Sequence, residues 1–352
     1  MNTSRPYLRL KTPQFSHHNI SFSPYFENRL ALASGANFGL VGNGRIHIID
    51  LDPNIPGGLK LVRYFETRDC VFDIAWSESH ENQIVAACGN GAIKMFDVTL
   101  EGLPIKSWHE HSAEIMSIEW NNLQKDTFVT SSWDQTIKIW TSSRSTSLLT
   151  IQAHQGQIYN ATFSPHSPSI LATCSSDGLI NIFDLRSQSS SSSSSSSSAS
   201  ASASVAKPAL SIPAGISTGT GGGFGNPIEI LSCDWNKYDP NLLASSDKNG
   251  SIKLWDMRSV SNNVNGNIER NGRQIGKHHL ATRKIAWSPH KRDIIASTGY
   301  DMTCKVWNIN SPNPIHVHSE HTEFVMGINW ALFDPGLLAS AAWDEEVHLY
   351  RV

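Results

Sequence analysis

The sequence predicts an all-β fold, a closed ring of seven four-stranded blades formed by residues 1–352 as a single domain. The first observation is a repeat. Each copy has an aromatic that closes a short strand, a Ser/Pro-type turn, a small-residue apolar strand, an Asp/Asn-Gly-type turn and a strand ending in an aromatic and Asp. The copies close at Asp50, Asp97, Thr141, Asp184, Asp256, Asn308 and Arg351. Most of the intervals between these positions are in the forties, which matches the length of about 40–45 residues of one propeller blade.

Alternation of side chains within the copies is the second observation. In Ile137-Lys138-Ile139-Trp140, apolar and polar residues alternate with the period of two expected for a strand. The copies resemble the WD40 repeat, so the expected architecture is a seven-bladed WD40 β-propeller. Its blades are expected at residues 15–52, 66–98, 109–141, 152–185, 226–257, 276–309 and 319–352.

The interval between Asp184 and Asp256 is longer than the others. It contains ten consecutive serines, Ser189–Ser198, followed by a stretch rich in Ser, Ala and Gly. Such a composition offers too little apolar surface to offset the entropy lost on ordering. Residues 187–225 are therefore predicted to form a disordered loop between the fourth and fifth blades, and residues 261–274 a smaller one between the fifth and sixth.

The segment before the first blade is expected to close the ring. We expect the strand around Tyr7–Lys11 to complete the last blade, although it precedes the first one in the chain. Such a strand would join the two ends of the ring and remove its exposed edges.

Histidines and aspartates recur with the repeat. Nine residues before a strand-closing aromatic stand His111, His154, His278 and His321, and in the inner turns stand Asp134, Asp177, Asp301 and Asp344. Four similar sets in one protein cannot all be active sites. In WD40 proteins such residues form a hydrogen-bond network that ties neighbouring turns together, because buried polar groups need partners. We therefore predict a structural role for them.

Composition and motifs argue against several classes of function. The net charge of -3 and the pI near 6.6 give no overall basic field, so no nucleic acid partner is expected. The sequence has no GxSxG, GxxxxGK[ST] or HExxH motif and no convincing carboxylate pair, so we predict a protein that is not an enzyme and has no catalytic residues. The five cysteines are scattered without metal-ligand spacing, so neither a metal nor another cofactor is expected.

Targeting signals are also missing from the sequence. The N-terminal segment MNTSRPYLRLKTPQ lacks an apolar core, and no uninterrupted apolar stretch is long enough to span a bilayer. The C-terminal HLYRV is not an SKL-type peroxisomal address. We expect a cytosolic protein that does not insert into membranes and that needs a partner to reach an organelle.

Alignment of the repeats on their closing aromatics places a set of residues around one mouth of the central channel. Exposed aromatic and Met side chains on such a ring of turns have no core to fill and usually mark a binding site. The apolar candidates are Phe72, Met116, Trp133, Tyr159, Tyr300, Phe324, Met326 and Trp343, and the acidic candidates are Asp69, Glu114 and Glu229. The complementary ligand is a short basic helix with an apolar stripe at i, i+3, i+4 and i+7.

Some segments are more specific than the generic repeat. They are FSPYFENRLALASGANFGLVGNG, CVFDIAWSESHENQ, SSWDQTIKIW, ILSCDWNKY, RKIAWSPH, YDMTCKVWN and HTEFVMGINW. The degenerate first blade with NFGLVGNG and the combination of CVFDIAW with HTEFVMGINW are the most distinctive. Together these segments closely resemble the WD40 peroxin family that imports proteins bearing the type-two, N-terminal peroxisomal targeting signal.

This resemblance implies a cytosolic receptor that binds the helical signal of peroxisomal matrix proteins. It also implies a co-receptor peroxin, docking peroxins at the peroxisome, and cycling between the cytoplasm and the peroxisomal membrane and matrix. By position, it implies that Asp69 and Glu114 bind the cations of the signal, with Glu229 a weaker candidate. The residues implied to frame its apolar stripe are Trp133, Tyr300 and Trp343.

Two alternative functions stay open at this stage. FDLR, which ends at Arg186, and WDMR, which ends at Arg258, resemble the adaptor-docking motif of substrate receptors of cullin-type ubiquitin ligases. A chromatin or signalling scaffold is the other alternative, but the chain has no long flanking helix or acidic tail to support it.

Overall fold

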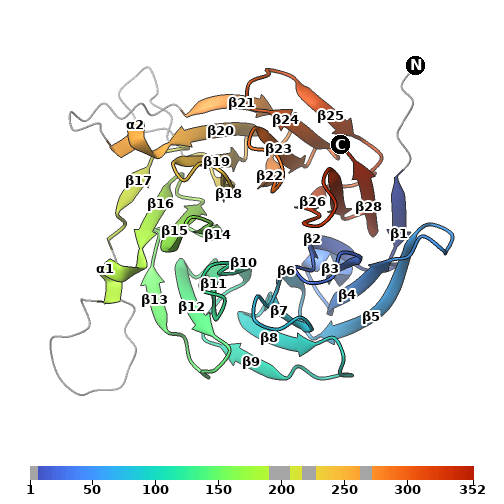
Figure 1. Ribbon diagram of the computed structural model, residues 1–352. Helices are drawn as coiled ribbons and strands as arrows, with labels where there is room; N and C mark the ends of the chain where they lie inside the picture. Colours follow the sequence, from blue (N-terminus) through green and yellow to red (C-terminus); the bar gives the residue numbers. More distant parts are fainter. Residues whose placement is uncertain (1–6, 190–206, 216–226, 262–271) are drawn as a thin grey trace.

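The computed structural model is a closed ring of seven four-stranded antiparallel sheets (Figure 1). It describes residues 7–189, 207–215, 227–261 and 272–352. The innermost strands of consecutive blades contact one another around the whole ring, including the last blade and the first. The predicted seven-bladed β-propeller is therefore confirmed.

Blades 1 to 4 follow one another along the chain. In order, their strands are β2 (Ser16–Phe22), β3 (Arg29–Gly35), β4 (Gly44–Leu51) and β5 (Leu59–Thr67); β6 (Val71–Trp76), β7 (Gln83–Cys88), β8 (Ala92–Asp97) and β9 (Lys106–His109); β10 (Ile115–Trp120), β11 (Thr127–Ser132), β12 (Thr136–Thr141) and β13 (Leu149–Gln152); and β14 (Ile158–Ser164), β15 (Ser167–Ser175), β16 (Ile180–Asp184) and β17 (Leu210–Ile212).

Blades 5 to 7 complete the ring. Their strands are β18 (Ile230–Trp235), β19 (Leu242–Asp247), β20 (Ser251–Asp256) and β21 (Arg273–Lys277); β22 (Thr282–Trp287), β23 (Ile294–Gly299), β24 (Cys304–Asn308) and β25 (Pro314–His318); and β26 (Val325–Trp330), β27 (Leu337–Ala342) and β28 (Glu346–Arg351) with β1 (Leu8–Lys11). The described helices are short: η1 (Ala36–Gly39), α1 (Leu185–Ser189) and α2 (Met257–Ser261). None of these described helices has the length and apolarity needed to cross a membrane.

The N-terminal strand β1 closes the ring, as the sequence suggested. It pairs with β28 in a register that sets Leu8 opposite Leu349 and Lys11 opposite Glu346. Leu10 packs against the apolar core between blades 7 and 1. Blade 7 is thus built from both ends of the chain, and β28 has no open edge.

The structure corrects the expected disordered loops. Within residues 187–225, Leu210–Ile212 forms β17, which pairs with β16 as the outermost strand of blade 4. Within residues 261–274, Arg273 already begins β21. These short outer strands are ordered by pairing with a preformed sheet, which local composition does not reveal. The rest of both expected loops lies largely outside the described residues, at 190–206, 216–226 and 262–271.

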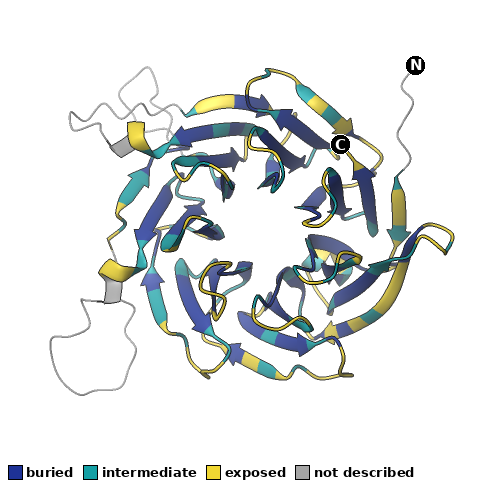
Figure 2. Ribbon diagram, in the orientation of Figure 1, coloured by how far each residue is buried: buried dark blue, intermediate teal, exposed yellow. Residues whose placement is uncertain are grey.

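The core lies between the faces of neighbouring blades. Between blades 1 and 2, for example, Ala31 and Ile48 pack with Ile74, Trp76 and Phe96. Figure 2 shows the inner strands mostly buried, whereas the outermost strands are mainly a mixture of intermediate and exposed residues. Small residues in the second strands let the sheets approach closely, while the large aromatics fill the widening gap further out.

Side chains from one blade satisfy the innermost strand of the next. The N–H groups of an inner strand that face the neighbouring blade have no partner strand. Asp73 accepts the N–H of Ile118 at 2.9 Å, and Glu119 accepts that of Phe163 at 3.1 Å. In the same way, Ser117 accepts the N–H of Ala161, Asp234 that of Trp287 and Asn329 that of Phe22. Each bond satisfies a buried donor and links two consecutive blades.

The recurring histidines and aspartates form the expected network. In the blade of His111, Nδ1 lies 2.8 Å from Asp134 and Nε2 lies 2.8 Å from Thr130, to which Trp140 also donates. The same arrangement joins His154 to Asp177, His278 to Asp301 and His321 to Asp344. These side chains have their hydrogen-bonding capacity filled, and the structural interpretation is confirmed.

Further histidines gather where the ring closes. The rings of His318 and His348 share a hydrogen bond of 2.9 Å, and Tyr7, just before β1, packs against both. Burial, with a smaller contribution from the imidazole of His321, lowers the pKa of His318 to about 3 and the pKa of His17 and His348 to about 4. These three histidines are neutral at pH 7.

Deleting residues 1–12 should destabilise the protein. The deletion removes β1, uncovers the edge of β28 and exposes the apolar surface under Leu10, which together should lower the free energy of unfolding by roughly 3 kcal/mol. Thermal unfolding measures this change, and deleting only residues 1–6, which lie outside the described structure, serves as the control. An unchanged melting temperature in the longer deletion would show that β1 does not close the ring.

Acidification should weaken the fold around the same seam. An unfolded histidine has a pKa near 6.5, whereas those of His17, His318 and His348 lie well below it, so the unfolded chain binds protons first. Their contribution is complete above pH 6.5 and is lost as the pH falls towards 4, by up to about 1.4 kcal/mol per pH unit for each group. Urea unfolding at pH 7.5, 6.5 and 5.5 measures it. His348→Gln should give a shallower pH dependence, and parallel curves for both proteins would contradict the assignment.

Candidate functional site

One face of the ring carries the residues singled out by the repeat alignment. In six blades the residue after the second strand donates its backbone N–H to the carbonyl of the residue six positions before the closing aromatic. Trp133 bonds in this way to Glu114 at 3.0 Å, and Trp343 bonds to Phe324 at 3.0 Å. The alignment therefore identified pairs of neighbours in space. We call this face, formed by the loops between second and third strands and the loops that enter the first strands, the rim face.

Four aromatic rings form a continuous run over blades 6, 7 and 1. Tyr300 stacks on Phe324 with centroids 4.6 Å apart, Phe324 lies 5.4 Å from Trp343, and Trp343 lies 5.4 Å from Phe38. We call these four residues the aromatic run. It contains three predicted apolar residues and adds a fourth, Phe38, which is 46% exposed.

A second, separate group lies over blades 3 to 5. Trp133 meets Tyr159 edge to face at 6.4 Å, and the Tyr159 hydroxyl donates to Glu229 at 2.7 Å. Five of the eight predicted apolar residues therefore lie in two separate groups on the rim face.

The remaining apolar candidates mostly fill the channel mouth. Phe72, Met116 and Met326 line a small space of about 20 Å³ together with other residues of the inner strands. Met116 is 8% exposed and Met326 5% exposed, so these two are buried side chains. They were expected on an exposed rim, but the inner strands converge here and the long side chains close the mouth.

The three acidic candidates differ in their surroundings. Asp69 and Glu114, on blades 2 and 3, are partly exposed, and within the described residues their carboxylates have no ion pair. Glu229 instead pairs with Lys248 at 2.6 Å and accepts the Tyr159 bond. Burial tends to raise the pKa of Glu229, but the bonds from Lys248 and Tyr159 outweigh it and hold the pKa below its ordinary value. Among the three candidates, the carboxylates without an ion pair therefore lie on blades 2 and 3.

Three rim residues were missed as candidates. His18, four positions before the closing Phe22 of blade 1, lies 5.1 Å from Phe72 and 6.0 Å from Trp343. Arg283 occupies the same position in blade 6 and lines the channel mouth. Extending the alignment to the degenerate first repeat would have identified His18, whereas the position of Phe38 depends on the loop conformation.

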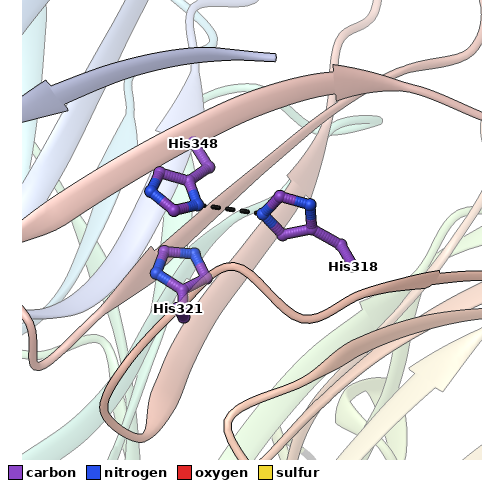
Figure 3. Close-up of side chains that lie close together, drawn as sticks. All are labelled: His318, His321 and His348. Atoms are coloured by element: carbon purple, nitrogen blue, oxygen red, sulfur yellow. Dashed lines mark hydrogen bonds between the residues drawn. The ribbon is translucent and has the colours of Figure 1, made fainter. Parts of the chain in front are cut away.

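The histidine cluster of blades 6 and 7 is poorly suited to a metal ion. The nitrogen atoms of His318, His321 and His348 lie within 4.8 Å of one another (Figure 3). The rings of His321 and His348, however, are stacked 3.9 Å apart at 10°, so their in-plane lone pairs cannot converge on one ion. Both nitrogens of His321 are also occupied, by Asp344 and Ser340.

The central channel contains a larger cavity of about 330 Å³. Its charged lining residues include Asp73, Glu119 and Asp234, which bond to backbone N–H groups of the next blade. These carboxylates are structural acceptors. The rim face therefore carries aromatic rings over blades 6, 7 and 1, of which Phe38 is exposed and the others are half-buried, and over blades 2 and 3 two carboxylates without an ion pair among the described residues.

Comparisons with known proteins agree with this geometry. The model of the family described as WD domain, G-beta repeat matches residues 102–141, 145–184, 222–256 and 273–308. The chain is 33% identical to the peroxisomal targeting signal 2 receptor of Saccharomyces cerevisiae, covering 98% of this chain and 99% of that protein. Proteins of the same name from Schizosaccharomyces pombe and Mus musculus are 30% and 31% identical, over 98% and 97% of this chain and 99% and 95% of theirs.

Proposed function

Because this chain belongs to the family of peroxisomal targeting signal 2 receptors, we propose that it binds the helical, N-terminal type-two signal of peroxisomal matrix proteins on its rim face. The observation that carries the proposal is that the aromatic run, in which Phe38 is exposed and the other rings are half-buried, shares the rim face with the carboxylates of Asp69 and Glu114, which have no ion pair among the described residues. An amphipathic basic helix has the apolar stripe and the cations that such a surface accommodates.

The division of charge gives the helix a direction. Glu229 is neutralised by Lys248, so the basic end of the signal is best accommodated over blades 2 and 3, beside Asp69 and Glu114. Its apolar stripe then extends over blades 1, 7 and 6, where Trp343 and Tyr300 belong to the aromatic run. Trp133 borders the opposite side of the site.

The cellular cycle is part of the same proposal. We infer that the protein picks up cargo in the cytosol with a co-receptor peroxin, meets docking peroxins at the peroxisome and returns. Its role is to bind and deliver, with no reaction catalysed, as expected of a propeller whose buried polar groups serve the fold. The ligase alternative gains nothing from the structure, because Arg186 and Arg258 form two-pronged bonds with Asp184 and Asp256 of their own blades.

Reversing the charge of Glu114 should abolish cargo binding. Glu114→Lys places a cation opposite the basic end of the signal, and loss of one partner in a desolvated interfacial pair costs about 2–5 kcal/mol, which is more than tenfold in affinity. A fluorescent basic-leucine targeting peptide, titrated in yeast cytosol as a source of co-receptor, reports binding by anisotropy. An Arg→Glu peptide should not bind to wild-type protein.

Glu101→Lys is the matched control for this charge reversal. Its side chain is 92% exposed in the loop between β8 and β9, which leaves the sheet on the face opposite the rim. It should bind the peptide like wild type, and both variants should keep the wild-type melting temperature. Equal binding by Glu114→Lys and wild type would contradict the acidic site.

Removing Lys248 should strengthen binding of the same peptide. Lys248→Ala frees the carboxylate of Glu229 to interact with a cationic ligand, and affinity should rise about two- to fivefold, the range typical of one exposed charge pair. Lys291→Ala removes the same charge from the opposite face and should leave affinity unchanged. If affinity rose equally in both variants, the cause would be the net charge of the protein and not the carboxylate of Glu229.

A further inference from the structure

The loop between β3 and β4, residues 36–43, differs from the corresponding turns of the other blades. In those blades the turn is short and contains polar residues such as Asp134 or Asp344. Here the sequence ANFGLVGN has no charged residue, and Leu40 is 84% and Val41 73% exposed. We call this segment the blade-1 loop.

The blade-1 loop holds a defined conformation. Ala36 donates its N–H to the carbonyl of Asn43 at 2.9 Å, Leu40 donates to that of Asn37, and the Asn37 amide donates to the carbonyl of Val41 at 3.1 Å. Asn37 and Phe38 both have positive φ, of 49° and 59°. A left-handed Phe is strained and persists only where its surroundings hold it, which is a common feature of binding sites. The exposed apolar side chains are therefore presented by a fixed scaffold.

The loop fills the space between the acidic and the aromatic parts of the rim face. On one side Phe38 contacts Trp343, the nearest member of the aromatic run. On the other side the base of the loop rests on blade 2. A Cβ added to Gly39, whose φ is +79°, would meet Cys70 Sγ at 2.9 Å, and one added to Gly44 would lie too close to the Asp69 carbonyl. Leu40 and Val41 therefore project from a loop seated beside Asp69.

We propose that the blade-1 loop binds the apolar side chain that lies within one helical turn of the signal's N-terminal basic residue, and that Leu40 and Val41 select a branched apolar residue there. One turn of helix advances 5.4 Å, so a helix with its cation at Asp69 and Glu114 and its stripe towards Trp343 must pass over this loop. The loop offers no charge or side-chain hydrogen-bond donor at its tip, which suits an apolar group. This inference rests on the proposed function and concerns the same site.

A double-mutant cycle tests the proposal. The protein variant is Leu40→Ser with Val41→Ser, and the probes are the labelled basic-leucine peptide, a form with Ala in place of the apolar residue next to its Arg, and a form with Ala at the far end of its stripe. Leu103→Ser is the control, because Leu103 is also 84% exposed but lies between β8 and β9 on the opposite face. Melting temperatures establish that each variant is folded.

The expected result is selective coupling. The double variant should bind the parent peptide at least about fivefold more weakly than wild type does. On the double variant, the peptide with Ala next to its Arg should bind as well as the parent peptide. The peptide with Ala at the far end of its stripe should bind more weakly than the parent peptide on both proteins. If wild type binds the parent peptide and the double variant binds it equally well, the loop has no part in recognition and this inference fails while the proposed function stands. If the double variant bound all three peptides more weakly than wild type by the same factor, the inference would also fail, because the loop would then not contact the apolar residue next to the Arg. Failure of wild type to bind any peptide would overturn the proposed function itself.

Discussion

In a ring of sheets, the backbone N–H groups of the innermost strand of every blade need hydrogen-bond acceptors, and most of the architecture follows from that constraint. Each such strand pairs on one side only, so its free N–H groups would be left without acceptors near the channel. The preceding blade carries Asp, Glu, Ser or Asn side chains that accept these N–H groups. Asp73 accepts that of Ile118, and Asn329 accepts that of Phe22. These bonds fix the rotation of one blade against the next. The outer loops on the rim face, and with them the site, inherit their relative positions from this inner ring.

The sequence was most informative where the repeat imposes a register. The closing aromatics, the His and Asp sets and the placement of Trp133 beside Glu114 all follow from alternation along strands and a turn geometry that recurs from blade to blade. Outer strands such as β17 are three residues long and have little pattern of their own. Their existence depends on the edge offered by β16, so local composition suggested disorder instead.

Prediction of the site was limited in a different way. Whether a rim residue is free or occupied depends on neighbours from other blades. Glu229 and Glu114 occupy equivalent positions in their repeats. Only Glu229, however, forms an ion pair with Lys248 and accepts a hydrogen bond from Tyr159. Met116 was correctly placed near the channel but is buried there, because its exposure depends on how closely seven strands converge. Phe38 required a left-handed loop conformation that no periodic pattern encodes. The proposed binding site therefore depends on departures from the repeat.

The pairing of β1 with β28 also bears on how the chain is made. Leu8 leaves the ribosome long before its partner Leu349, because β1 precedes the first blade in the chain and β28 belongs to the seventh. Until β28 has been synthesised, β1 has no strand to pair with, and Tyr7 cannot pack on His318 and His348. Contacts this distant in sequence are slow to form, and an open ring exposes strand edges to other chains in the meantime. The seam between β1 and β28 thus cannot close until most of the ring has been made, and the edge of β28 stays open until it does.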